Sequence, residues 1–292
     1  MLNVEENISL ARHTSLHVGG PAAFFIHVKT DEEILEALQF AQQKKMPFFI
    51  LGKGSNTLFS DEGFKGVIIH MEDRRISHKG MVLTAASGVF MRPFVNYALD
   101  NSLRGLEELA GIPGTVGGAI RGNAGTWSTD IQKVLHHADV LVPDGSSWKV
   151  VQMSNDECLF GYRTSIFKKH IDWIILRGHF ALQLGDAQEG QKIVAKDHAD
   201  RHAKQPYDAA SAGSIFKNPD KENKIFSGAL IEKAGLKGFT IGGAEISTKH
   251  ANFILNRQKA TSADIMAVIK KAQEEVKKQS SIDLEPEIVI VP

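Results

Sequence analysis

Ser214 lies in a segment whose composition could support catalysis. It follows Gly213 in the run Ala-Gly-Ser-Ile-Phe-Lys-Asn-Pro, where the glycine gives the hydroxyl freedom and Pro219 fixes the loop. Acyl transfer is not indicated, because Phe216 occupies the place of the final glycine in the nucleophile motif Gly-X-Ser-X-Gly. A capping or solvated serine is the ordinary alternative, so the residue alone does not decide its role.

Two further charged residues could take part in chemistry. Arg163 has Phe160, Tyr162 and Phe167 as neighbours, which indicates a buried environment in which a guanidinium needs an anion. A surface arginine is the alternative. Glu287 follows Pro286 at the start of an apolar closing segment, where a carboxylate is usually a solvated edge charge.

A glycine-rich run between residues 111 and 125 is the most constrained stretch of the chain. Glycine costs conformational entropy, so this density indicates a backbone that turns sharply and approaches a flat or phosphorylated ligand closely. A flexible loop is the alternative, but apolar residues at three positions argue against a linker. The glycines are Gly111, Gly114, Gly117, Gly118, Gly122 and Gly125, and the apolar residues are Ile112, Val116 and Ile120.

A second glycine turn follows a short apolar run at residues 46–51, which predicts a buried strand. The turn, Gly52-Lys-Gly-Ser-Asn56, can form a backbone nest that binds an anion. It is neither a dinucleotide-binding Gly-X-Gly-X-X-Gly motif, because Thr57 is the sixth residue, nor a Walker loop. Together, the two turns predict a cofactor that contains pyrophosphate.

The chain resembles the UDP-N-acetylenolpyruvoylglucosamine reductase family. The resemblance extends in order from about residue 7 to the C-terminus, and the match at residues 214–219 is highly specific. It rests on both glycine-rich runs, Asn123-Ala-Gly125, Gly161-Tyr-Arg163, Ala212-Gly-Ser-Ile-Phe-Lys-Asn-Pro219, Ile241-Gly-Gly243 and Glu285-Pro-Glu287.

The resemblance implies an α+β flavoprotein. Its two-part FAD-binding domain would be of the vanillyl-alcohol-oxidase-like (PCMH) type, with a C-terminal α+β substrate-binding domain. NADPH would reduce non-covalently bound FAD, leave, and be replaced by UDP-N-acetylglucosamine enolpyruvate, which would be reduced to UDP-N-acetylmuramate for peptidoglycan synthesis.

The resemblance also implies roles for the three candidate residues. Ser214 would be the general acid that protonates the substrate carbon after hydride arrives, and Lys217 on the same loop could stabilise its alkoxide. Arg163 would bind the substrate carboxylate and the enolate that forms beside it. Glu287, rather than Glu285, would hold or polarise the transient enol.

Ligand contacts follow from the same resemblance. The residues that would bind FAD are Gly52, Lys53, Gly54, Ser55, Asn56, Gly111, Pro113, Gly114, Thr115, Gly117, Gly118, Asn123, Ala124 and Gly125. The residues that would bind the substrate are Lys204, Lys217, Asn218 and His250, with Lys249 beside them. Gly122 and Trp127 depart from the family pattern and leave the shape of the isoalloxazine pocket open. The length fits the shorter subtype without an extra tyrosine loop.

Apolar patterns predict an α+β chain, because the regular strand and helix alternation of a parallel sheet is absent. Strands are expected near residues 22–28, 46–51, 67–70, 81–84, 138–142, 148–151, 171–176, 178–182 and 287–291. Helices are expected after a capping box of Thr30 and Glu33, over 187–203 with Ile193 and Val194 inward, and over 226–234. Another is expected over 89–101, with Phe90, Phe94, Tyr97 and Ala98 inward. The last is expected after a cap at Thr261 or Ser262, with Ile265, Ile269, Ala272 and Val276 on one face.

We expect an FAD-binding domain over residues 1–190, with subdomains about 1–65 and 66–190, and a substrate-binding domain over residues 191–292. The boundary is placed in a linker around residues 184–198. The final strand, about 285–292, can pack back near the flavin.

Composition limits the partners. The 34 basic side chains balance 34 acidic ones, so no overall field draws the chain to nucleic acid or to an anionic membrane. The absence of a signal-like start and of a long apolar run predicts a cytoplasmic protein, expected to be a monomer. The only cysteine, Cys158, is expected to be buried and unreactive.

No metal is expected, because no histidine spacing forms a ligand set. His136 and His137 are adjacent, and His198 and His202 lack the glutamate of a zinc motif.

Two rival functions stay open. One is a flavin oxidase of the same fold with a tethered cofactor, for which His13 and His17 are attachment candidates. The other is a nucleotide-binding regulatory module without catalysis.

Overall fold

The computed structural model describes residues 2–292. These divide into two compact units, neither of which is one continuous stretch. Unit 1 holds residues 2–4, 26–53 and 68–201, and unit 2 holds residues 5–25, 54–67 and 202–292. Three borders fall within strands β1 (Asn3–Ser9), β2 (Pro21–Val28) and β5 (Phe64–Met71), one falls between residues 53 and 54, and one falls near the end of helix α5 (Ala187–Lys204). The expected boundary near residue 190, between an FAD-binding and a substrate-binding domain, therefore stays a prediction.

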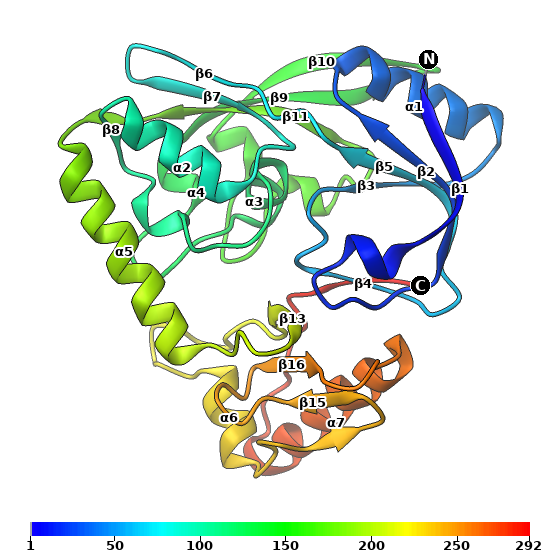
Figure 1. Ribbon diagram of the computed structural model, residues 1–292, viewed down its shortest axis with the longest axis vertical. Helices are drawn as coiled ribbons and strands as arrows, with labels where there is room; N and C mark the ends of the chain where they lie inside the picture. Colours follow the sequence, from blue (N-terminus) through cyan, green and yellow to red (C-terminus); the bar gives the residue numbers. More distant parts are fainter. Residues whose placement is uncertain (1) are drawn as a thin grey trace. The chain divides into compact units, whose positions relative to one another are not determined.

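Unit 1 is built on a five-stranded antiparallel sheet with the order β10-β9-β11-β7-β6. Helices α2 and α3 lie on one face of this sheet (Figure 1), where Phe94 packs against Phe180 in the core. The strands are β6 (Ile76–Lys79), β7 (Val82–Ala86), β9 (Leu135–Asp144), β10 (Ser147–Ser154) and β11 (Ile174–Ala181).

The remaining elements of this part of the chain are short, except for two helices. The four-stranded sheet has the order β1-β2-β5-β3, and β12 pairs with β8. The elements are α1 (Asp31–Gln43), β3 (Phe48–Leu51), α2 (Met91–Asp100), β8 (Leu103–Arg104), α3 (Val116–Gly122), α4 (Ile131–Val134), β12 (Gln183–Leu184), α5 (Ala187–Lys204) and the 3₁₀ turns Glu107–Leu109, Asp156–Cys158 and Ile166–Lys168. Another 3₁₀ turn, Leu10–His13, belongs to unit 2.

Helix α1 begins at the predicted cap. The hydroxyl of Thr30 accepts a hydrogen bond from the N–H of Glu33 at 3.2 Å. The Glu33 carboxylate, however, accepts from the N–H of Lys29 at 2.5 Å. In a capping box this carboxylate would accept from the N–H of the cap residue, Thr30. Among the bonds described, the predicted motif is therefore present only through the Thr30 hydroxyl.

Three local expectations in unit 1 were wrong. Phe90, expected to face inward, is 37% exposed, because it precedes α2 as its cap residue. The strands expected at 171–176 and 178–182 form one strand, β11, which begins only at Ile174. Ile193 is an exposed hydrophobic residue, since α5 is polar on most sides and packs against the core through Gly190 and Val194.

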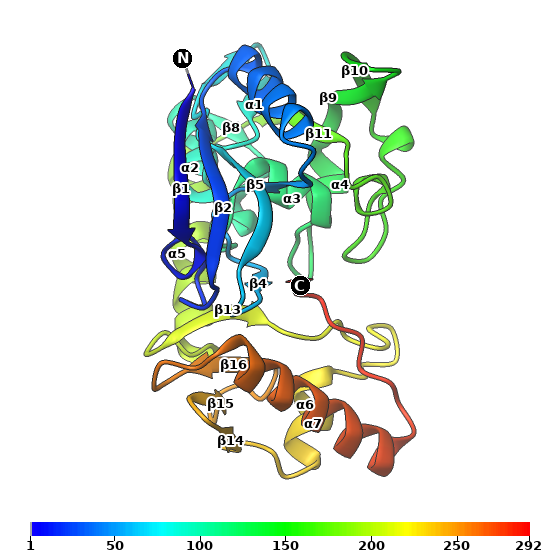
Figure 2. The ribbon, with the colours of Figure 1, turned by 90° about the vertical axis from the view of Figure 1, so that its right-hand side faces the viewer.

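Unit 2 contains a four-stranded antiparallel sheet with the order β13-β16-β15-β14. Helices α6 and α7 pack beside it (Figure 2). The predicted cap Thr261 forms a full capping box with Asp264, and α7 buries the predicted face of Ile265, Ile269, Ala272 and Val276. The elements are β13 (Ala210–Ser214), α6 (Ser227–Lys233), β14 (Thr240–Ile241), β15 (Ala244–Ile246), β16 (Phe253–Asn256) and α7 (Ser262–Ser280).

A two-stranded parallel pair completes unit 2. Strand β17 (Val289–Val291) lies beside β4 (Thr57–Phe59), which directly follows the first glycine turn. The last strand of the chain is thereby placed next to a segment more than two hundred residues earlier. Across residues 2–292, no helix combines the length and apolar character needed to span a membrane.

Candidate active site

Ser214 and Glu287 are brought together by backbone pairing within unit 2. Ser214 ends strand β13, and the N–H of Glu287 donates to the carbonyl of the next residue, Ile215, at 2.7 Å. Phe216 forms a bridge with Pro286, and the N–H of Lys217 donates to the carbonyl of Glu285 at 2.9 Å. The two segments that carry the predicted acid and carboxylate therefore run side by side.

Asn252 fixes the loop that follows Ser214. Its buried side chain accepts from the N–H of Phe216 at 3.0 Å and donates to the carbonyl of Phe216 at 2.9 Å. Its own carbonyl accepts from the N–H of Ile215 at 2.8 Å. Because buried backbone groups are costly to leave unpaired, Asn252 is a positioning residue for Ser214. Sequence reasoning missed it, since it lies 36 residues from Phe216.

Lys217 and Glu285 form an ion pair with 2.5 Å between Nζ and Oε1. The lysine side chain is mostly buried, whereas the glutamate is exposed. This pairing uses Glu285 rather than Glu287. It also directs the Lys217 ammonium to a carboxylate, so a role for this lysine at the Ser214 hydroxyl stays a prediction. Asn218 accepts from the N–H of Ser227 at 3.2 Å, at the start of α6.

Arg163 lies in unit 1, where it contacts the glycine-rich run. Its guanidinium donates from Nη2 to the carbonyl of Gly125 at 2.8 Å and from Nη1 to the carbonyl of Asn123 at 3.4 Å. The Asn123 side chain in turn donates to the carbonyl of Gly161 at 3.0 Å. These reciprocal bonds join the Gly-Tyr-Arg segment to residues 123–125, as two parts of one site.

The two glycine-rich runs meet where Gly52 packs against Thr115. A Cβ atom added at Gly52 would lie 2.5 Å from the Thr115 hydroxyl oxygen, so no larger residue fits without movement. Gly54 has φ +65° and lies against the carbonyl of His13. The left-handed conformation and the close approach both require glycine. The sequence therefore predicted correctly that these positions need bare backbone.

The central run contains a short helix that sequence reasoning did not predict. Thr115 caps α3 by accepting from the N–H of Gly118. The N–H groups of Val116 and Gly117 donate to the carbonyls of Val89 and Ser87, each at 2.8 Å. Since these three donors are already used within the protein, a phosphate has to be held by other groups of the turns.

Other groups near these runs suit a phosphorylated ligand. The Ser87 hydroxyl is buried and has no hydrogen-bond partner among the described residues. Two cations, Lys53 and Arg74, lie 5.6 and 4.3 Å from the centre of the Phe90 ring. At the end of α3, a Cβ added at Gly122 would meet nothing within 4 Å. An available hydroxyl, nearby positive charge and open backbone fit a flavin dinucleotide.

The other predicted cofactor residues occupy the loops around α3. Gly111 and Pro113 precede the helix, Gly114 accepts from the N–H of Met91 at 3.2 Å, and Ala124 accepts from the N–H of Ile131 at 3.0 Å.

Asn56, in the first glycine turn, is engaged within the protein, because its side chain donates to the carbonyl of Glu287 at 3.1 Å. Asn56 thus ties the end of the first glycine turn, beside Ser55, to the carboxylate segment.

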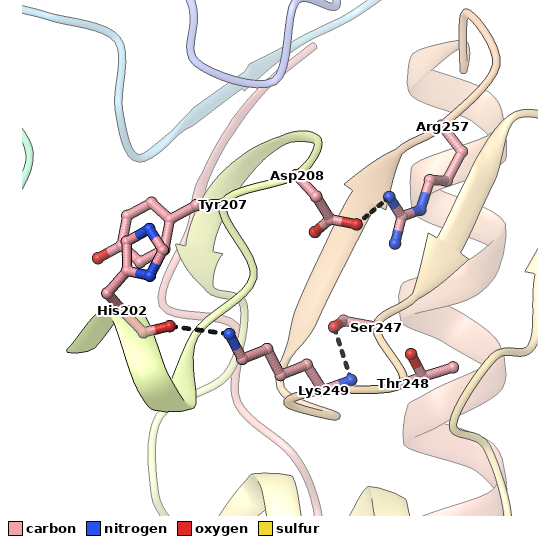
Figure 3. Close-up of a pocket in the computed structure, with 7 residues that line it drawn as sticks. All are labelled: His202, Tyr207, Asp208, Ser247, Thr248, Lys249 and Arg257. Carbon is pink, nitrogen blue, oxygen red and sulfur yellow. Dashed lines mark hydrogen bonds and ion pairs between the residues drawn. The ribbon is translucent and has the colours of Figure 1, made fainter. Parts of the chain in front are cut away.

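A hollow of about 460 Å³ lies in unit 2 and is lined by Lys249, beside the predicted substrate residue His250. Figure 3 shows Lys249 reaching the carbonyl of His202, 2.8 Å away, and Asp208 paired with Arg257 at 2.5 Å. The lining is His202, Tyr207, Asp208, Ser247, Thr248, Lys249 and Arg257. Arg257 is already paired with Asp208 and Glu245, so Lys249 is the lining cation that suits an anionic ligand.

The four residues predicted to bind the substrate are not among those that line this hollow, although Lys204 and His250 are close in sequence to lining residues. Lys204 is the exposed last residue of α5, two residues after His202. His250 follows Lys249, and burial lowers the pKa of its imidazole below the ordinary value. Its Nδ1 accepts from the N–H of Asn252 at 3.2 Å. A neutral His250 therefore supports Asn252, in addition to any contact with substrate.

Cys158 is buried, as expected. Burial and the neighbouring Glu157 raise the pKa of its thiol to about 12. The thiolate needed for covalent chemistry is thus disfavoured at neutral pH.

Comparisons with known proteins agree with this geometry. Residues 22–150 match the model of an FAD binding domain, and residues 205–291 match that of the UDP-N-acetylenolpyruvoylglucosamine reductase C-terminal domain. The chain is 39% identical over 289 residues to a UDP-N-acetylenolpyruvoylglucosamine reductase from Clostridium botulinum, covering 99% of this chain and 93% of the relative. A reductase of the same name from Halalkalibacterium halodurans is also 39% identical, over 99% of this chain and 94% of the relative.

Solved structures extend the comparison. The crystal structure of UDP-N-acetylenolpyruvylglucosamine reductase from Thermus caldophilus matches all of both chains, with a TM-score of 0.84 and 32% identity. Aclacinomycin oxidoreductase matches 98% of this chain and 63% of its own, with a TM-score of 0.50 and 13% identity. The second likeness concerns the fold alone.

The paired glycine turns and the matched domains define an FAD-dependent oxidoreductase of α+β fold, with an FAD-binding domain and the C-terminal domain of this reductase. Within that class, the chain belongs to the UDP-N-acetylenolpyruvoylglucosamine reductase family.

Proposed function

We propose that this chain reduces UDP-N-acetylglucosamine enolpyruvate to UDP-N-acetylmuramate with electrons from NADPH, a step in making the peptidoglycan precursor. Family membership supports the reaction. The observation that carries the assignment of residues is the pairing of Glu287 with Ile215, directly beside Ser214. An acid and a carboxylate held on paired segments are what protonation of a transient enolate requires.

FAD supplies the hydride chemistry when bound, and the protein supplies orientation and charge. The cofactor residues are those predicted around the Gly52 turn and α3, to which we add the Ser87 hydroxyl. Lys53 provides positive charge beside the Gly52 turn for the pyrophosphate. Arg163 holds the carbonyls of Asn123 and Gly125 in place, so it keeps this part of the cofactor loop in one conformation.

Ser214 is the proposed proton donor. Hydride addition to the terminal carbon of the enol ether forms a C–H bond and leaves negative charge on the adjacent carbon, shared with the carboxylate. The Ser214 O–H bond then breaks, its proton forms the second C–H bond, and solvent returns a proton to the alkoxide. Arg163 is proposed to bind the substrate carboxylate during this step, and Glu287 to polarise the enol.

The nucleotide part of the substrate is proposed to bind Lys204, Lys217, Asn218 and His250. The hollow lined by Lys249 and Arg257 is a candidate position for one end of this ligand. The cytoplasm is the proposed compartment, because NADPH and nucleotide sugars are soluble metabolites there, and the proposed oligomeric state is a monomer.

The cofactor proposal predicts a yellow protein with about one FAD per chain, all of it released by acid denaturation. The motivation is the contact of the Gly52 turn with Thr115, beside the unpaired Ser87 hydroxyl of the same unit. The measurement is the flavin absorbance of the supernatant and of the precipitate. Flavin that stays in the precipitate would favour a tethered oxidase. Folded protein that binds no added FAD would contradict the cofactor assignment.

A further inference from the structure

His27, His70 and Glu72, none of which is assigned a role in the reaction, bring three metal-ligand atoms together within unit 1. His27 lies on β2 and His70 on β5, which are neighbours in the four-stranded sheet. Glu72 follows β5 immediately, and its N–H donates to the carbonyl of Val28 at 2.8 Å. Spacing along the chain did not reveal this group, because 43 residues separate the two histidines.

Strand alternation places both histidines on one face of the sheet. Their flanking residues Ile26, Val28, Ile69 and Met71 are buried hydrophobic residues, and successive side chains of a strand point to opposite faces. His27 and His70 are exposed by 22% and 15%, and Glu72 by 26%. The group is therefore held by the sheet while one side stays open to solvent.

The three ligand atoms form a small and nearly regular triangle. The two Nδ1 atoms lie 3.3 Å apart, and Oε1 of Glu72 lies 2.9 Å from Nδ1 of His27 and 3.3 Å from Nδ1 of His70. Ligands about 2.0–2.1 Å from a tetrahedral zinc ion are separated from one another by about 3.3–3.4 Å. The observed triangle already matches one face of such a tetrahedron.

We propose that His27, His70 and Glu72 bind a divalent ion of the zinc class, with water as the fourth ligand. Two histidines and one glutamate are a known protein ligand set for zinc that leaves one position open. The ion would join β2 to β5 and stabilise the folded chain, since a ligand that binds only the folded state shifts the folding equilibrium toward it.

A second group of two histidines and one carboxylate, His137, Asp139 and His179, is less suitable as a metal site. His137 and His179 stack with their rings 16° from parallel, a geometry that prevents both rings from directing lone pairs at one ion. Its carboxylate, Asp139, also contacts Arg177 at 3.2 Å through the same oxygen that lies near His179. At the first group the nearby cation, Lys29, is 4.0 Å from the other oxygen of Glu72 and is 69% exposed. It can move away when an ion binds.

The ordinary alternative is a hydrogen-bond network in which Glu72 accepts from both imidazoles. Calorimetric titration of the FAD-loaded protein with zinc chloride, after chelator treatment and dialysis, distinguishes the two. We expect about one zinc ion per chain. His70→Ala should weaken binding by about 100-fold or more, because loss of even an outer partner of a metal ligand typically costs 10–100-fold. Glu72→Gln, which keeps the shape of the side chain, should also weaken it.

Two control variants locate the ion. His78→Ala removes an exposed imidazole from β6, and His179→Ala disables the second group; both should bind zinc like the parent protein. Cobalt in place of zinc should give tetrahedral absorption bands at longer wavelength than the flavin, and His70→Ala should abolish them. Absence of zinc uptake by the parent, unchanged uptake in His70→Ala and Glu72→Gln, or loss of uptake only in His179→Ala would each overturn the proposal. None of these readouts depends on turnover.

Discussion

Ser214→Ala should bind FAD and be reduced by NADPH at the parent rate, but its flavin should be reoxidised slowly by the enolpyruvyl sugar. Hydride transfer from NADPH needs no proton from this hydroxyl. Protonation of the substrate carbon does, and it must come from a fixed direction. Loss of a positioned general acid lowers a rate by about 10²–10⁴-fold. Stopped-flow absorbance of the flavin at saturating substrate measures the two half-reactions separately.

Two further variants make this test specific. Ser214→Cys keeps a proton donor in nearly the same place and should recover part of the rate. Ser211→Ala removes a hydroxyl from the same strand, β13, and should behave like the parent. Reoxidation of Ser214→Ala at the parent rate would show that Ser214 is not the proton donor.

Arg163→Lys should retain flavin reduction by NADPH and lose about 10- to 100-fold in reoxidation by the substrate, since a hydrogen bond to a charged group contributes about 1.5–3 kcal/mol. Lysine keeps the charge, but its ammonium cannot reproduce a planar fork of donors. In this chain the fork already spans the carbonyls of Asn123 and Gly125. A lysine cannot hold both carbonyls and a carboxylate with the same geometry.

The readout that matters for Arg163→Lys is the ratio of the two half-reactions, measured alongside FAD affinity. Arg92→Lys, an exposed substitution on α2, is the matched control and should leave both rates unchanged. Equal damage to both half-reactions would instead indicate that Arg163 acts through the flavin loop alone or that the variant misfolds.

Features that depend on a few adjacent residues were predictable from the sequence. Thr261 and Asp264 form the cap of α7, and the apolar spacing of Ile265 and Ile269 identified its buried face. The same holds for Gly54, whose positive φ reflects a local turn. Short-range rules failed where a neighbour from elsewhere intervened: Phe90 faces Lys53 and Arg74 instead of the core.

Long-range contacts explain what the sequence could not reveal. Asn252 holds the Ser214 loop through bonds to a residue 36 positions away, and Asn56 bonds to Glu287 across 231 positions. No local pattern marks Asn252, and the glycine turn that marks Asn56 does not reveal its bond to Glu287, because each asparagine acts through backbone groups of another segment. The family resemblance named the residues expected to react, whereas the fold revealed the residues that hold their segments in place.

The most direct test of the account follows the flavin of the parent protein without oxygen. NADPH should bleach the visible absorbance of the oxidised flavin. UDP-N-acetylglucosamine enolpyruvate, added next, should restore this absorbance, with about one UDP-N-acetylmuramate formed per flavin. Under the account, the enol ether restores the colour and the same sugar nucleotide without the enolpyruvyl group does not. A flavin that NADPH cannot reduce, or one that stays bleached with the enolpyruvyl sugar present, would contradict it.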